Sequence, residues 1–176
     1  MFLYVRAKFH WSLETYTTYS SINTVTTSLG SVIGIYFLHK LLKINEPFVI
    51  LIGFISFIGG SILCGLATKE WHIYAAAGIS FLYSVISPMA RSLISKLVSS
   101  NEYGKVFSFL AVCESFVDPL GSPLFIYIYN HTLLTFPGAF SLVAAGISIF
   151  GMIFSILVVV IQKTTQIQSP YSMLNS

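Results

Sequence analysis

Long apolar stretches separated by short polar turns make up most of the chain. Each stretch has about 20 residues or more, the length that a helix needs to cross a hydrocarbon layer of about 30 Å. We therefore predict complete transmembrane helices at residues 16–38, 47–67, 71–97, 104–129 and 136–161. Residues 1–5 are predicted to be the stump of a further helix. The expected fold class is an all-α membrane protein with five complete transmembrane helices plus this stump.

Small residues recur at a spacing of four within the predicted helices. Gly30 and Gly34 form one such pair, and Ser61 and Gly65 form another. Small side chains at this spacing let two membrane helices approach closely. We expect both pairs to lie at contacts between helices.

Composition supports a membrane protein and excludes several other classes. Of the 176 residues, 55% are hydrophobic and only 9% are charged, whereas soluble domains have about 25% charged residues. The nine Lys and Arg residues are scattered, so we expect no nucleic-acid partner. No HExxH, Walker or GxSxG motif is present, so an enzyme is not expected. Cys64 and Cys113 are predicted to be free thiols, and no metal or cofactor is expected.

The loop charges predict the orientation of the helices. If the helices alternate, five basic residues share one side of the membrane: Lys40, Lys43, Lys96, Lys105 and Lys163. Arg6, Lys8 and Lys69 share the other side. Basic residues favour the cytoplasmic side, so the tail at 163–176 is predicted to be cytoplasmic. The sequon at Asn130 then lies on the outer side, as a candidate glycosylation site.

The first predicted span is rich in hydroxyl groups. Tyr16, Tyr19, Asn23, Thr27 and Gly30 follow helical spacing, which favours one face that lines an aqueous cavity and binds a solute. Alternatively, the Ser and Thr side chains donate to carbonyls of their own helix and only bend it. Both interpretations stay open at this stage.

Two further spans contain prolines and charged residues. Pro88 precedes Arg91 by three residues in the third span, where proline removes a backbone hydrogen bond and kinks the helix. A guanidinium group there can bind an anionic solute or pair with a carboxylate, or it can reach the membrane surface.

The fourth span contains two carboxylates and its own proline. Glu114 and Asp118 are four residues apart, and Pro119 follows as a second predicted kink. Carboxylates inside a membrane mark proton pathways or pair with a cation. We predict proton exchange at Glu114 and Asp118. The alternative is that Glu114 pairs with Arg91 and Asp118 caps a helix that restarts at Pro119.

Several segments resemble a known family. They are residues 87–98 (SPMARSLISKLV), 101–108 (NEYGKVFS), 2–11 (FLYVRAKFHW), 129–133 (YNHTL) and 136–140 (FPGAF). Together they resemble the proton-coupled folate transporter family of major facilitator carriers, over residues 2–162. The resemblance implies that the five spans match helices 8–12 of the 12-helix major facilitator fold. Residues 1–162 would then be a partial C-terminal helix bundle.

The same resemblance implies the function and the partners. It assigns Arg91 to substrate binding and coupling, and Glu114, less strongly, to a position that is acidic in some members. The expected activity is proton-coupled transport of a small organic anion, with the lipid bilayer and a missing N-terminal half as partners. The alternative is a truncated membrane protein that does not transport, and that pairs with a full-length carrier and regulates it.

The tail adds a prediction about location. Tyr171 and Leu174 fit a tyrosine-based sorting signal, with a bulky apolar residue three positions after the tyrosine. The expected location is an integral, multi-pass position in the plasma membrane or in an endosome or lysosome.

Overall fold

A computed structural model describes residues 1–42, 44–99, 101–133 and 136–167. Side chains are not described at His39, Lys40, Asp118, Gln162, Lys163 and 165–167. The described residues form helices and no β-strand. These are α1 (Phe2–Phe9), α2 (Leu13–Gly34), the π-helical η1 (Ile35–Leu41), α3 (Glu46–Gly65), α4 (Glu70–Ile79), the 3₁₀-helical η2 (Ser80–Val85), α5 (Ile86–Leu97), α6 (Tyr103–Thr132) and α7 (Ala139–Ile167).

Five helical segments in the described residues are long and apolar enough to cross a membrane. They are Leu13–Leu38, Glu46–Gly65, Glu70–Leu97, Tyr103–Thr132 and Ala139–Ile161. The third is built from α4, η2 and α5 in succession. The prediction of an all-α membrane protein with five complete spans is therefore confirmed, and α1 corresponds to the predicted stump. α7 continues as a helix to Ile167, five residues into the predicted tail.

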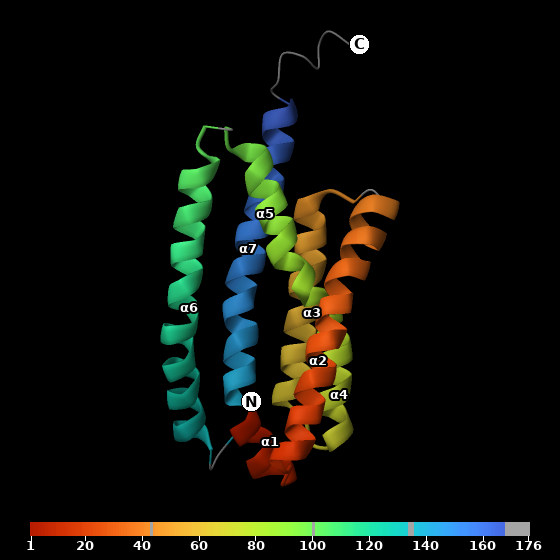
Figure 1. Cartoon of the computed structure of the whole chain (residues 1–176), viewed down its shortest axis with the longest axis vertical. Coiled ribbons are helices and arrows are strands. Elements are labelled where there is room, and N and C mark those ends of the chain that lie inside the picture. The colour runs from red at the N-terminus through yellow and green to blue at the C-terminus, as the bar shows by residue number, and fades with distance from the viewer. Residues whose placement is uncertain (43, 100, 134–135, 168–176) are drawn as a thin grey trace.

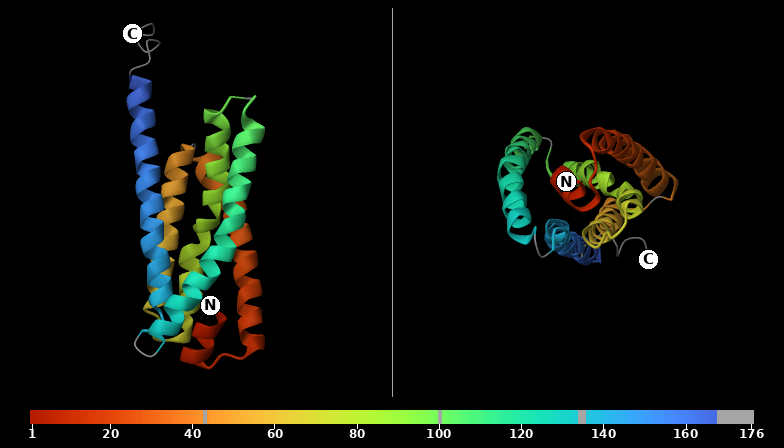
Figure 2. Two further views of the ribbon diagram at one scale, coloured as in Figure 1. Left: turned by 90° about the vertical axis from the view of Figure 1, so that its left-hand side faces the viewer. Right: turned by 90° about the horizontal axis from the view of Figure 1, so that it is seen from below.

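The connections between the spans alternate between the two ends of the bundle (Figure 1). The α2–α3 and α5–α6 connections lie at the same end as the last turn of α7, and α1 with the α3–α4 and α6–α7 connections lies at the other. In the view from below in Figure 2, α1 lies across the middle of the bundle, between α2 and α6. α3 packs against α7, α4, η2 and α5, whereas the main partner of α6 is α7.

Glycines bring two helices close to η2. A Cβ atom at Gly30 of α2 would overlap the carbonyl oxygen of Phe81, and one at Gly34 would lie 2.5 Å from Val85 Cγ2. From α3, a Cβ atom at Gly60 would overlap the Ser80 hydroxyl. η2 is thus held between two glycine-bearing faces, and the predicted contact at Gly30 and Gly34 is confirmed.

The second predicted pair also lies at a helix contact. Ser61 is buried, and a Cβ atom at Gly65 would lie 2.9 Å from Leu142 Cδ2. A Cβ atom at Gly138, the residue just before α7, would in turn overlap the Gly65 carbonyl oxygen. The end of α3 and the start of α7 therefore touch backbone to backbone.

The third span changes its helical geometry just before Pro88. Proline has no N–H group to bond the carbonyl of Ser84, four residues earlier. The tighter 3₁₀ segment η2 ends at Val85, and the α-helix resumes at Ile86. In contrast, α6 is one helix across Pro119 and Pro123, so no separate helix begins at Pro119.

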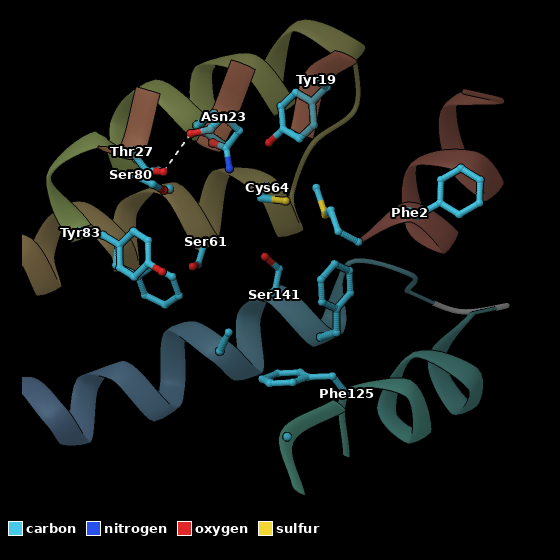
Figure 3. Close-up of a pocket in the computed structure, with 18 of the residues that line it drawn as sticks. Phe2, Tyr19, Asn23, Thr27, Ser61, Cys64, Ser80, Tyr83, Phe125 and Ser141 are labelled. Carbon is cyan, nitrogen blue, oxygen red and sulfur yellow. Dashed lines mark hydrogen bonds between the residues drawn. The ribbon is translucent and has the colours of Figure 1, made fainter. Parts of the chain in front are cut away.

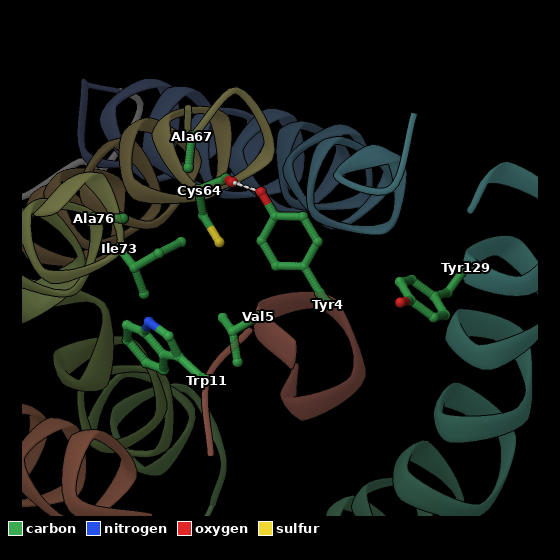
Figure 4. Close-up of a cluster of buried hydrophobic side chains, with 8 residues drawn as sticks. All are labelled: Tyr4, Val5, Trp11, Cys64, Ala67, Ile73, Ala76 and Tyr129. Atoms are coloured by element: carbon green, nitrogen blue, oxygen red, sulfur yellow. Dashed lines mark hydrogen bonds between the residues drawn. The ribbon is translucent and has the colours of Figure 1, made fainter. Parts of the chain in front are cut away.

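Buried apolar residues form a cluster near each end of the bundle. Figure 4 shows the cluster beside α1: Tyr4, Val5, Trp11, Cys64, Ala67, Ile73, Ala76 and Tyr129. Tyr4 donates to the Cys64 carbonyl at 3.0 Å, and Tyr129 donates to the Leu3 carbonyl at 2.9 Å, so α1 is fixed to α3 and α6.

A second buried cluster lies toward the opposite end of the bundle. Val49, Ile50, Val85 and Met89 join α3 to η2 and α5 there. Near that end, Lys96 also pairs with Glu46.

Substituting Gly30 by alanine tests the close packing around η2. The added methyl group meets a backbone carbonyl, which cannot turn away, so we expect Gly30→Ala to lower the free energy of unfolding by about 1–3 kcal/mol. The measurement is a denaturant titration in detergent micelles. Gly78→Ala is the matched control, because nothing lies within 4 Å of a Cβ atom there. Equal effects of the two substitutions would contradict the packing described.

Candidate functional site

A cavity of about 760 Å³ lies between α1, α2, α3, the α4–η2 segment, α6 and α7. Four of the five residues of the predicted stripe on α2 line it: Tyr16, Tyr19, Asn23 and Thr27. Figure 3 shows Tyr19, Asn23 and Thr27 facing Ser61 of α3 and Ser141 of α7 across this space. Among the side chains that the structure describes, the lining consists of hydroxyl, amide, aromatic and aliphatic groups, with one thiol, one thioether and no acidic or basic group. We call this space the uncharged cavity.

The two interpretations of the hydroxyl-rich span apply to different faces of α2. Five exposed residues donate to the carbonyl four residues earlier, at 2.8–3.0 Å: Thr17, Thr18, Ser21, Thr24 and Ser28. Thr27 does so as well, from the cavity side. Gly30 does not line the cavity, because it is buried against η2. The cavity face therefore ends at Thr27.

Aromatic contacts fix the tyrosines at the α1 end of this cavity. The Tyr19 ring centroid lies 5.5 Å from that of Trp11 and 5.5 Å from that of Tyr74, and 6.4 Å from that of Tyr16. The contacts with Trp11 and Tyr74 are edge-to-face, a geometry that holds ring orientation. Tyr19 is thus held in place by these two rings, and Tyr16 lies beside it with its ring plane tilted by 38°.

A second cavity, of about 530 Å³, contains the charged residues. Arg91 Nη2 donates to Glu114 Oε2 at 2.6 Å, joining α5 to α6. Their side chains are 49% and 46% exposed, and both line the cavity with Ser87, Ala90 and Ser148. We call this space the charged cavity. The structure therefore shows the ion pair that the sequence offered as the alternative to proton exchange.

The other predicted site residues lie apart from this pair. Pro88 is one turn before Arg91 on α5, and Pro119 lies in α6. Asn130 is exposed in the last turn of α6, at the same end as α1. The side chain of Asp118, and the sorting-signal residues Tyr171 and Leu174, lie outside what the structure describes.

Sequence reasoning missed the parts of both cavities that come from other helices. Ser61, Ser80, Ser141 and Phe125 line the uncharged cavity, and Phe57 and Tyr83 line both cavities. Each is a single residue within an apolar run, where aromatic and small polar side chains are common. The pattern gave no signal that separates them from residues facing lipid.

Comparison with known proteins identifies relatives of the chain. It is 30% identical over 153 residues to a probable peptidoglycan muropeptide transporter, SLC46, of Drosophila melanogaster, covering 85% of this chain and 30% of that protein. It is 30% identical over 135 residues to the chicken (Gallus gallus) lysosomal proton-coupled steroid conjugate and bile acid symporter SLC46A3, covering 76% and 28%. It is 31% identical over 119 residues to the proton-coupled folate transporter of Bos taurus, covering 68% and 26%.

These relatives confirm the resemblance inferred from the sequence. They are SLC46 solute carriers, which are major facilitator carriers. The chain spans about 30% of the length of the relatives it matches. No family model and no solved structure matches it. An integral, multi-pass location at the plasma membrane or in the endosomal and lysosomal system is likewise confirmed.

Cysteine labelling tests whether the stripe on α2 faces water. In a chain carrying Cys64→Ala and Cys113→Ser, we expect Asn23→Cys to react with a water-soluble thiol reagent at least about tenfold faster than Val25→Cys, because the reactive thiolate forms in water and not in hydrocarbon. Val25 is the control since it lies two residues away on α2, is 59% exposed and lines neither cavity. Equal rates would contradict the aqueous cavity.

Proposed function

We propose that this chain, which belongs with the SLC46 solute carriers of the major facilitator type, forms part of a carrier that moves a small organic anion together with a proton. Two of its relatives are named as proton-coupled carriers, of folate and of steroid conjugates and bile acids. The relatives are transporters, and the chain itself offers two solute-sized cavities between membrane-spanning helices. A transport role therefore fits better than an enzymatic one.

The Arg91–Glu114 ion pair is the observation that supports proton coupling. While Glu114 is ionised, it occupies the guanidinium group of Arg91 at 2.6 Å. A proton on Glu114 removes the negative charge and frees Arg91 to bind the carboxylate of a solute, which suits its planar, bidentate geometry. Release of the solute and then of the proton restores the pair. Solute and proton therefore bind together, and acid favours the solute-bound state.

The uncharged cavity supplies neutral contacts for the solute in this proposal. Tyr16, Tyr19, Asn23 and Thr27 present aromatic faces and hydrogen-bonding groups from one side of α2. Such a lining, mostly apolar with a few placed polar groups, is typical of solute sites in proteins. These residues orient the solute, and Arg91 provides the charge that selects an anion.

The rest of the carrier is proposed to come from further helices. α6 packs mainly on α7, and most of its side chains are exposed, which leaves both cavities open toward a partner. A missing N-terminal half would close them. The alternative, a chain that pairs with a full-length carrier and regulates it, uses the same open face.

The size of the endogenous polypeptide separates these two possibilities. We expect an immunoblot with an antibody against residues 162–176 to detect a product more than twice the 19.5 kDa of this chain. That result would place both halves in one polypeptide. A product at 19.5 kDa would contradict it and favour the regulatory alternative.

Uptake of a folate-like anion by the complete carrier tests the coupling mechanism. We expect acid to stimulate uptake in the unmodified carrier. Glu114→Gln should abolish this pH dependence while solute exchange continues, because Arg91 is then free at every pH. Arg91→Gln should reduce uptake by about tenfold or more at every pH, since one lost charged contact changes binding by this order.

The control for charge removal is Glu14→Gln. Glu14 lies in the first turn of α2 and lines neither cavity, so its loss should leave the pH dependence intact. The proton role of Glu114 would be excluded if uptake by the unmodified carrier did not depend on pH and Glu114→Gln left uptake unchanged.

A further inference from the structure

The uncharged and charged cavities meet at two aromatic residues. Phe57 and Tyr83 are the residues that line both spaces within the described part of the chain. Their ring centroids lie 5.1 Å apart, with the ring planes tilted by 43°. This contact joins α3 to η2. The two rings therefore stand where one cavity passes into the other.

The aromatic pair lies near the middle of the membrane. Phe57 is eleven residues from the start of α3 and eight from its end, or about 16 Å and about 12 Å at the rise of an α-helix. The uncharged cavity extends from this level toward Phe2 and Tyr16 at the α1 end. The charged cavity extends toward Ile94 and Leu110 at the opposite end. A solute that crosses the bundle must pass the level of the two rings.

Tyr83 stands on the irregular part of its span. A 3₁₀ segment within a longer helix often marks a hinge, and η2 is such a segment, between α4 and α5. It is held at both margins, where Ser56 donates to the Ile79 carbonyl and Ser84 donates to the Thr27 carbonyl at 2.6 Å. The Tyr83 side chain itself is 43% exposed. The backbone of η2 is thus anchored, while the Tyr83 ring contacts Phe57 and borders open space in both cavities.

We propose that Phe57 and Tyr83 form a partition between the two cavities, and that the Tyr83 ring is its moving part. The partition determines specificity by limiting the width of the solute that reaches Arg91 from the uncharged cavity. The role of the partition in specificity rests on the proposed transport function, because only a transported solute has to cross the partition. As a barrier to small molecules, it can be tested whether or not the chain transports.

Side-specific thiol labelling tests the partition without requiring transport. The reporter is Asn23→Cys in the uncharged cavity, in the complete protein without other accessible cysteines. A membrane-impermeant maleimide with a charged group is added to vesicles from the C-terminal side of the bundle. We expect Tyr83→Ala and Phe57→Ala each to raise the labelling rate from that side by about tenfold, because reactivity depends on access. The rate from the opposite side should not change.

Two control variants separate the partition from general loosening of the bundle. Tyr83→Phe keeps the ring and should label as slowly as the parent. Trp71→Ala removes an exposed aromatic residue from the same span that lines neither cavity, and it should also label slowly. If Trp71→Ala accelerates labelling as much as Tyr83→Ala, or if neither Tyr83→Ala nor Phe57→Ala accelerates it, the partition is overturned. If the proposed transport function is wrong, the uptake assay will show it, whereas the labelling rates do not depend on transport.

Discussion

Hydrocarbon offers no hydrogen-bond partner to a polar group, so each backbone amide and each charge in the spans needs a partner within the protein or in a water-filled space. The structure follows this constraint at several levels. The spans are helices throughout, and the exposed hydroxyl groups of α2 donate to their own helix carbonyls. The irregular segment η2 lies between α2 and α3, which shield it from lipid. Arg91 and Glu114 partner each other.

The same constraint explains why glycine collects around η2. A 3₁₀ turn inside a membrane span has weaker hydrogen bonds than an α-helix, so it depends on close contact with its neighbours. Gly30 and Gly60 provide that contact from α2 and α3, each without a side chain in the way. The two glycines therefore let the irregular turn pack closely between α2 and α3.

The length of the apolar runs was enough to predict the spans, and helical spacing was enough to predict the cavity face of α2 apart from Gly30, since both depend on residues near each other in the chain. Contacts between helices could not be predicted from these local patterns. The pairing of Arg91 with Glu114 joins positions 23 residues apart, and the sequence offered it only as one of two alternatives. Pro88 indicated a kink but not the 3₁₀ segment before it, and α6 continues as one helix across Pro119. Phe57 and Tyr83 carried no signal, because an aromatic residue in an apolar run also suits a lipid-facing surface.

The ion pair also limits how the proposed carrier can lose its coupling. A guanidinium group inside a membrane-spanning bundle is costly unless it has a partner, so Arg91 favours states in which it has a negative partner. Glu114 provides that partner when it is ionised, and a solute anion provides it when Glu114 is protonated. If a proton binds to Glu114 without a solute, Arg91 has no negative partner. If an anionic solute binds without a proton, it is repelled by the negative charge of Glu114. Both incomplete states are raised in free energy by the same interaction, so one ion pair is sufficient to link the movement of solute to that of the proton.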